Sequence, residues 1–444
     1  MGILSSLTKQ HREAIGILQI GTVLEYFDLM LYVHMAVLLD QLFFPKTDPH
    51  TAALISAMTF CSTFVFRPLG ALIFGYIGDN LGRKYTVIIT TTMMAISCVT
   101  MANLPTYAQI GITATWAITL CRIIQGLSSM GEIIGAQLYL TELIKPPIRY
   151  LAVSLIGCSN CFGTMLALAV TTAVLYLGLE WRIAFWIGAS IALVGFIART
   201  ALRETPEFVD AKRQIKKNFE KANIDPIILE KDLIFNEKVN KKTTIAYFLI
   251  QCSRPVCIYF CYIYCGNILK NLFSYTAVQV IQHNFVIALI DFFGVLFYAY
   301  LSYKVYPLKL VKIRMVLFTI FVLLLPLMIS CISSPMQVMG IQLFVCLFGI
   351  DMFPAEAILF VHIPIFKRFT YASFLYALSR ASMYIITSFG LVYLVKIMGN
   401  YGLLVIFIPI VIGFWFGVLH FEQLEKEGEN YPQAYRTKLM IKAV

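Results

Sequence analysis

The chain has 444 residues, of which 59% are hydrophobic and 13% are charged. Soluble globular proteins carry about 25% charged residues, so this composition excludes an ordinary soluble domain. The net charge of +11 would suit nucleic acid, but the basic residues are distributed between apolar segments and form no single patch, so nucleic-acid binding is not expected. We expect a polytopic membrane protein.

Apolar stretches near or above the ~20 residues that cross a bilayer predict the helices. The fold class predicted is all-α, with twelve transmembrane helices in two six-helix bundles. The spans are expected at 14–42, 51–77, 85–103, 107–140, 150–177, 181–202, 243–268, 274–303, 314–332, 336–365, 371–396 and 400–421. The predicted domains are an N-terminal bundle (1–202), a charged linker (203–242), a C-terminal bundle (243–421) and a solvent-exposed tail (422–444).

The first predicted helix contains two carboxyl groups. Glu25 and Asp28 are three residues apart, so both lie on one helical face, with Tyr26 nearby. An ionised carboxyl is costly at that depth in a membrane. At least one of them is therefore expected to bind and release protons; the alternative is a structural ion pair with Arg122 or Arg67.

A tight charged hairpin is predicted at 75–84, where the sequence G-Y-I-G-D-N-L-G-R-K separates two apolar segments. Glycine allows close backbone approach and turn conformations. Basic residues place the hairpin on the cytoplasmic side. The residues expected to shape it are Gly75, Asp79, Gly82, Arg83 and Lys84.

The fourth predicted helix carries a polar stripe on one face, formed by Arg122, Gln125, Ser129 and Glu132. Arg122 and Glu132 are about 15 Å apart by helical rise, so they cannot pair with each other. Each needs another partner, and Glu25 and Asp28 are the candidates.

In the second half, Asp351 and Glu356 flank Pro354, a pattern typical of a broken helix that lines a cavity. Arg380 in the next helix is expected either to attract a substrate carboxylate or to pair with one of these acids. Arg254 is a weaker candidate for the carboxylate. The loop at 301–314 corresponds to the 75–84 hairpin but lacks its acid and glycines.

Both termini are expected in the cytoplasm, because only Lys46, Lys270 and Lys396 fall in loops assigned to the outer side. The eleven cysteines lie mostly in apolar segments without nearby histidines, so no metal is expected. Phosphate-loop, H-E-x-x-H and G-x-S-x-G motifs do not occur in the sequence. We expect no cofactor, no enzyme activity and no ATP-driven pumping.

The 75–84 hairpin resembles the signature loop of the major facilitator superfamily, and R-I-I-Q-G at 122–126 with G-E at 131–132 resembles its fourth-helix motif. Further stretches are similar to the metabolite:proton symporter family, whose members carry proline and betaine, 2-oxoglutarate, shikimate or citrate. These stretches are L-E-Y-F-D-L-M-L-Y at 24–32, F-R-P-L-G at 66–70, W-R at 181–182 and R-E-T-P-E-F at 203–208.

The resemblance implies the major facilitator fold and proton-driven uptake across a bacterial inner membrane. It implies that Asp79 and Arg83 hold a cytoplasmic gate and that Arg122 lies near the proton path. The acidic counterparts of Arg122 would be Glu25, Asp28 and Glu132.

The leading hypothesis is a monomeric symporter, in the lipid bilayer, that imports a small zwitterion such as proline or glycine betaine together with protons. Substrate contacts are expected from Tyr26, Gln125, Asp351, Glu356 and Arg380. One alternative is a proton-coupled dicarboxylate (2-oxoglutarate-like) carrier. The other is a non-transporting membrane sensor on the same fold.

Overall fold

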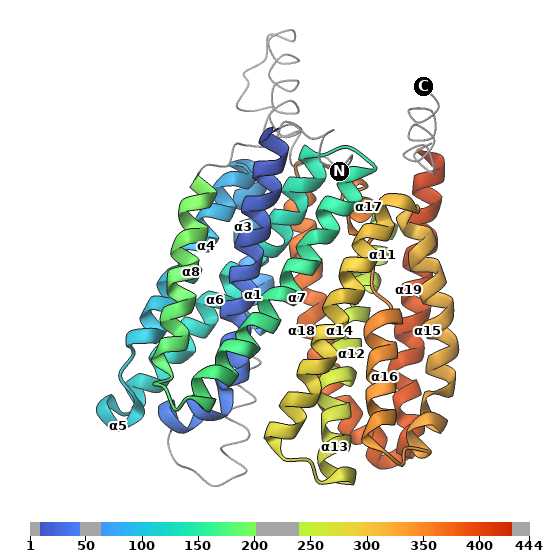
Figure 1. Ribbon diagram of the computed structural model, residues 1–444. Coiled ribbons are helices and arrows are strands. Elements are labelled where there is room, and N and C mark those ends of the chain that lie inside the picture. Colours follow the sequence, from blue (N-terminus) through green and yellow to red (C-terminus); the bar gives the residue numbers. More distant parts are fainter. Residues whose placement is uncertain (1–8, 45–63, 201–238, 429–444) are drawn as a thin grey trace, which may run out of the picture. The chain divides into compact units, whose positions relative to one another are not determined.

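The computed structural model describes residues 9–44, 64–200 and 239–428 (Figure 1). Within these ranges the regular structure is helical, and no strand occurs there. Seven of the described helices are long and apolar enough to cross a membrane. The predicted all-α membrane fold is therefore confirmed. Most of the predicted linker and most of the predicted tail lie outside the described residues.

The chain forms two compact units. Among the described residues, unit 1 comprises 9–44, 64–144, 159–200 and 364–377, and unit 2 comprises 145–158, 239–363 and 378–428. Two long helices, α7 (Ile148–Tyr176) and α18 (Arg368–Met398), are divided between the units. The bundle boundaries at 202 and 243 stay a prediction.

Unit 1 is built on long helices that pack around α6. Its helices, besides parts of α7 and α18, are α1 (Lys9–Phe43), α3 (Arg67–Asn80), α4 (Arg83–Asn103), α5 (Tyr107–Ile110), α6 (Ile112–Leu143) and α8 (Arg182–Thr200). Helix α4 packs against α6 and α8, and α1 packs against the same two helices. The predicted span at 107–140 is interrupted because Gly111 adopts φ 60°, a left-handed conformation that ends α5.

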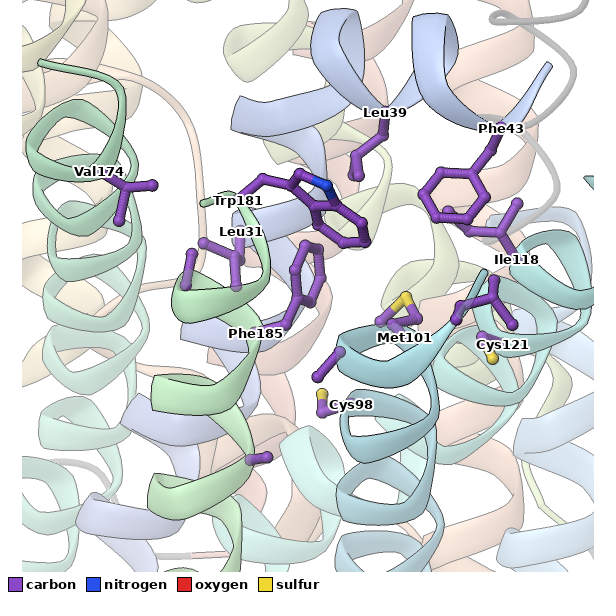
Figure 2. Close-up of a cluster of buried hydrophobic side chains, with 14 of the residues drawn as sticks. Leu31, Leu39, Phe43, Cys98, Met101, Ile118, Cys121, Val174, Trp181 and Phe185 are labelled. Atoms are coloured by element: carbon purple, nitrogen blue, oxygen red, sulfur yellow. The ribbon is translucent and has the colours of Figure 1, made fainter. Parts of the chain in front are cut away.

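An aromatic cluster fixes one end of the unit 1 core (Figure 2). The Trp181 ring packs edge-to-face against Phe43 at 5.5 Å and against Phe185 at 5.8 Å. Burying each such side chain stabilises the fold by roughly 1.5–3 kcal/mol. Cys98 and Cys121 lie in the same cluster, as expected for small apolar residues.

Unit 2 contains several interrupted helices. They are α11 (Lys241–Gln251), α12 (Ser253–Ile258), the π-helix η2 (Tyr259–Tyr264), α13 (Cys265–Phe273), α14 (Ala277–Lys304), α15 (Pro307–Ser330), α16 (Pro335–Phe348), α17 (Glu356–Val361), the 3-10 turn η3 (Gly399–Tyr401) and α19 (Gly402–Glu427). The predicted break around Pro354 is present, because α16 ends at Phe348 and α17 begins at Glu356.

A second break, in the span predicted at 243–268, was not expected from the sequence. Helix α11 ends at Gln251, and α12 begins at Ser253. Pro255 has no N–H group to donate to the carbonyl of Gln251, which is four residues earlier, so the regular hydrogen-bonding pattern of the helix is interrupted at this point. The π-helix at 259–264 follows immediately, and π-segments are frequent at functional sites.

The last helix is longer than the sequence predicts. It continues six residues past 421, to Glu427. Glu422 and Glu425 are buried because Lys312 pairs with Glu422 at 3.0 Å, while Tyr306 and His362 bond to Glu425. The first residues of the predicted tail are therefore packed helix, which corrects the expectation of a solvent-exposed segment there.

Candidate functional site

The 75–84 hairpin forms as the sequence predicts. Helix α3 ends at Asn80 and α4 begins at Arg83. Gly82 between them has φ 122°, in the region that favours glycine. Lys84 follows in the first turn of α4 and is partly exposed.

Asp79 binds the beginning of α18. Its carboxylate accepts hydrogen bonds from the backbone N–H groups of Phe369, at 3.0 Å, and Thr370, at 2.8 Å. The first N–H groups of a helix have no acceptor within the helix, and the helix dipole favours a negative charge there. The acid of the hairpin therefore caps α18 within unit 1.

Arg83 is the centre of this contact and is completely buried. It donates to the Gly78 carbonyl at 2.7 Å, to the Ile365 carbonyl at 2.8 Å and to Glu142 at 3.0 Å. Glu142 also accepts from Arg368, at 3.2 Å. The sequence analysis missed Glu142 because this residue lies two positions past the end of the span predicted at 107–140. An acidic residue at that place is expected in a solvent-exposed loop.

The glycines of the hairpin permit the close approach. A Cβ at Gly75 would lie 2.6 Å from the Cα atom of Thr370, and a Cβ at Gly78 would lie 2.5 Å from the Phe369 ring. Real Cβ atoms are not found so close to other heavy atoms. Any larger residue at Gly75 must therefore separate the hairpin from α18.

Asp79 lies outside the predicted spans. Burial raises its pKa to about 6, although Arg83 and the N–H groups of Thr370 and Phe369 act in the opposite direction. The hydrogen bonds from Phe369 and Thr370 therefore favour the ionised carboxylate of Asp79, and burial opposes it.

Inside unit 1, a chain of polar contacts joins three helices. Arg122 Nη1 donates to Gln125 Oε1 at 2.9 Å, and Gln125 Nε2 donates to the Cys98 sulfur at 3.6 Å. The Cys98 thiol in turn bonds to the carboxyl of Asp28. All four side chains are buried, with Asp28 2% exposed. The described path from Asp28 to Arg122 therefore runs through Cys98 and then Gln125. The sequence did not predict a role for Cys98 in this path.

Glu25 is also buried, at 3% exposure, one turn from Asp28 on α1. Tyr26 is partly exposed and lies against Gly163 of α7. Gly188 of α8 leaves room for the Asp28 carboxyl, because a Cβ there would collide with it. The side chain of Glu132 lies outside the described residues, so its role stays a prediction.

In unit 2, Asp351 lies in the break between α16 and α17. It accepts from Arg254 at 2.8 Å and from Arg314 at 2.8 Å. Arg314 was counted among the basic residues of the 301–314 loop, but the structure places it within α15, at 4% exposure. Sequence reasoning missed it because α15 begins seven residues before the predicted span.

The other two predicted substrate contacts in unit 2, Glu356 and Arg380, lie on the consecutive helices α17 and α18. Arg380 is buried in α18 and donates to Gln251 Oε1 at 3.3 Å and to Ser379 Oγ at 3.4 Å. Glu356 is the first residue of α17, where the helix dipole favours a carboxylate. No cluster of three or more metal-binding side chains occurs in the described part of the chain.

The geometry thus gives unit 1 a buried chain of polar contacts from Asp28 to Arg122 and a charged hairpin, and gives unit 2 a broken helix whose Asp351 pairs with two arginines. The sequence profile of the Major Facilitator Superfamily matches residues 18–364. The chain belongs to this superfamily. The resemblance seen in the hairpin and fourth-helix motifs is confirmed, and with it the predicted fold class.

Known relatives match only part of the chain. The inner membrane metabolite transport protein YhjE of Escherichia coli is 39% identical over 208 residues, which cover 44% of this chain and 47% of that protein. A proline/betaine transporter of Salmonella typhimurium is 34% identical over 204 residues, 44% of this chain and 41% of its own length. The chain therefore covers less than half the length of these relatives.

Solved structures match along most of the chain. The proton:xylose symporter XylE has a TM-score of 0.74 at 15% identity, covering 94% of this chain and 95% of XylE. The human organic anion transporter MFSD10 has a TM-score of 0.67 at 16% identity, covering 93% of this chain and 99% of that protein. At these identities the likeness shows the fold alone.

Proposed function

We propose that the chain is a proton-coupled symporter that imports a small zwitterion such as proline or glycine betaine by alternating access. The observation that carries this proposal is the buried relay from Asp28 through Cys98 and Gln125 to Arg122. Its similarity to a proline/betaine transporter supports the choice of substrate.

The relay suits proton coupling because a buried carboxyl is costly when it is ionised and lacks a nearby positive charge. Asp28 stays neutral when it carries a proton, and after losing the proton it depends on Arg122 for electrostatic support. Substrate binding that changes the distance between Arg122 and Asp28 then changes the affinity of Asp28 for the proton. Glu25 and Glu132 are proposed to share this task.

The hairpin is proposed to act as the cytoplasmic gate. Its contacts with the beginning of α18 would form in one state of the transport cycle and break in another. Asp79 supplies the bonds to α18 and Arg83 a bond to Ile365 just before it, while Gly75 permits the close approach and Gly82 the turn. Lys84 is proposed to keep the hairpin on the cytoplasmic side.

The predicted substrate contacts of Tyr26, Gln125, Asp351, Glu356 and Arg380 remain proposals. So do a monomeric state, a bacterial inner-membrane location, absence of enzyme activity and cytoplasmic termini. The relatives and the solved structures are small-molecule transporters by name, which does not favour the sensor. The proline/betaine relatives do not favour the dicarboxylate carrier.

Uptake into proteoliposomes tests the function. Radiolabelled proline, glycine betaine and 2-oxoglutarate are offered with and without an inside-alkaline pH gradient. We expect one of the two zwitterions to accumulate only with the gradient, and the gradient's effect to vanish with a protonophore. Accumulation of 2-oxoglutarate alone would replace the zwitterion with a dicarboxylate, and accumulation of none beside an active reference symporter would contradict the proposal.

The orientation is testable with Cys331, in the turn between α15 and α16 that we assign to the outer side. It is exposed, whereas the other described cysteines are buried or partly buried. We expect a membrane-impermeant maleimide to label intact cells at Cys331, and Cys331→Ser to remove that label. Labelling of this residue only in inverted vesicles would reverse the proposed topology.

A further inference from the structure

Two cysteine sulfurs are in contact in unit 2. Cys261 lies in the π-helix η2 and Cys346 lies in α16, and their Sγ atoms are 3.5 Å apart. A covalent S–S bond is about 2.05 Å long, so both residues are thiols in this structure. They are 85 residues apart in the chain, and the sequence did not predict that they meet. The proposed relay and the proposed gate use neither sulfur.

Gln342 of α16 holds the two elements together one turn from this contact. Its Nε2 atom donates to the Cys261 carbonyl at 2.7 Å, and its own carbonyl accepts from the Cys261 sulfur at 3.8 Å. His283 of α14 fixes Gln342 in turn, with 2.7 Å between His283 Nε2 and Gln342 Oε1. Gln342 and Cys346 are four residues apart, so they lie on the same face of α16. The bonds to Gln342 therefore keep the Cys261 sulfur against the Cys346 sulfur.

The two sulfurs differ in their access to a reagent. Cys346 is partly exposed, whereas Cys261 is only 2% exposed. The thiolate is the reactive form of cysteine, and apolar surroundings disfavour it, so a lone thiol at this place would react slowly. A second sulfur in contact changes the outcome, because a well-oriented pair reacts as if its partner were present at about 10⁵ M or more. Once Cys346 is oxidised, Cys261 is therefore the thiol that reacts with it.

We propose that Cys261 and Cys346 form an oxidation site, which closes to a disulfide and ties η2 to α16. The oxidant is a peroxide. The Cys346 sulfur takes one oxygen of hydrogen peroxide as the O–O bond breaks, which gives a sulfenic acid and releases one water. The Cys261 sulfur then attacks the Cys346 sulfur, and the hydroxyl group leaves as a second water with the remaining thiol proton. The two thiols lose two electrons and two protons, and the peroxide gains both.

The disulfide would restrain the interrupted helices of unit 2. Helix η2 follows α12, which begins just after the break at Cys252, and α16 ends at the break that contains Asp351. Packed helices slide past one another in many conformational changes, and a covalent link prevents such sliding between η2 and α16. We therefore expect the disulfide to slow transport. This effect rests on the proposed function, whereas the formation of the bond does not.

Mass spectrometry of the purified full chain tests the bond itself. The wild type is treated with hydrogen peroxide and then denatured with N-ethylmaleimide present, so that every remaining thiol is blocked. We expect a peptide pair that joins Cys261 to Cys346, lighter by two hydrogen atoms than the separate peptides and absent after dithiothreitol. Linkage of Cys346 to Cys265, which lies one turn after Cys261, would overturn the inference. Linkage between two chains, or no linkage at all, would overturn it as well.

Three serine variants measure the effect of the bond on uptake. Cys261→Ser and Cys346→Ser each remove one sulfur of the pair at nearly constant size. Cys257→Ser is the matched control, because Cys257 lies one turn before Cys261 and outside the pair. Peroxide should lower the initial rate of uptake by the wild type and Cys257→Ser in proportion to the fraction of linked chains, and dithiothreitol should restore it. Cys261→Ser and Cys346→Ser should keep their initial rates.

The two readouts separate this inference from the symport proposal. A linked peptide pair in a chain without gradient-driven uptake would confirm the oxidation site while the symport proposal fails. Gradient-driven uptake by a chain that forms no linked pair would overturn the inference alone. An equal loss of uptake in all three serine variants would contradict the assigned effect of the bond on transport.

Discussion

Replacing Asp28 with Asn is expected to abolish proton-driven accumulation of substrate while leaving substrate exchange intact. The amide keeps nearly the same shape in its buried place beside Cys98 and Gly188 but cannot release a proton. Transport would then lose its coupling to the gradient without losing the fold.

The size of the effect follows from the gradient. One pH unit is worth about 1.4 kcal/mol per proton, so a symporter that moves one proton can accumulate its substrate up to about tenfold. We expect the wild type to approach that ratio and Asp28→Asn to stay near equal concentrations. Uptake with and without an inside-alkaline gradient, followed by counterflow of preloaded substrate, measures both quantities.

Glu180→Gln is the matched control, because Glu180 is an exposed carboxyl of unit 1 at 61% side-chain exposure. It should keep the wild-type ratio. Cys98→Ala removes the link between Asp28 and Gln125 and should lower the rate of gradient-driven uptake without abolishing it. If Asp28→Asn still accumulates substrate as the wild type does, Asp28 is not the coupling group.

The sequence predicts the helices and the hairpin well because both depend on local patterns. Long apolar runs place the spans, and the glycines and charges at 75–84 specify a turn whose conformation the structure shows. Asp79 and Arg83 were recognised for the same reason. The partners of Asp79 in α18 are some 290 residues away in the chain, and Ile365, which accepts from Arg83, is 282 residues away. Hydropathy does not indicate which distant residues will meet.

The residues that sequence reasoning missed owe their roles to tertiary contacts. Glu142 and Arg314 have the appearance of loop charges, yet each is buried because a distant partner compensates its charge. Cys98 has the appearance of a small apolar residue, and only the packing of α1, α4 and α6 makes it a bridge between Asp28 and Gln125. One sequence shows the residue types but not these pairings.

Replacing Gly75 with Ala is expected to detach the beginning of α18 from the hairpin. The new methyl group would meet the backbone of Thr370 at 2.6 Å, and backbone atoms cannot rotate aside as a flexible side chain can. Overpacking of this kind costs about 1–3 kcal/mol. That cost falls on the contact because the two bonds to Asp79 form only when the segments touch.

The rate of amide hydrogen exchange at Phe369 and Thr370 measures whether this contact is formed. The N–H groups of Phe369 and Thr370 belong to the first turn of α18, so Asp79 is their acceptor, and losing it exposes them to water. In peptides covering 366–377, exchange at these two amides should accelerate on the order of 5- to 150-fold. This range corresponds to the overpacking cost of about 1–3 kcal/mol.

Gly16→Ala provides the control, because no heavy atom lies within 4 Å of the position its Cβ would occupy. This variant should exchange as the wild type does. If Gly75→Ala also leaves the 366–377 peptides protected, the hairpin does not hold α18, and the gate must be sought elsewhere. If it accelerates their exchange and also changes the rate of uptake, the contact that Asp79 and Arg83 make is a step in the transport cycle as well as a feature of the fold.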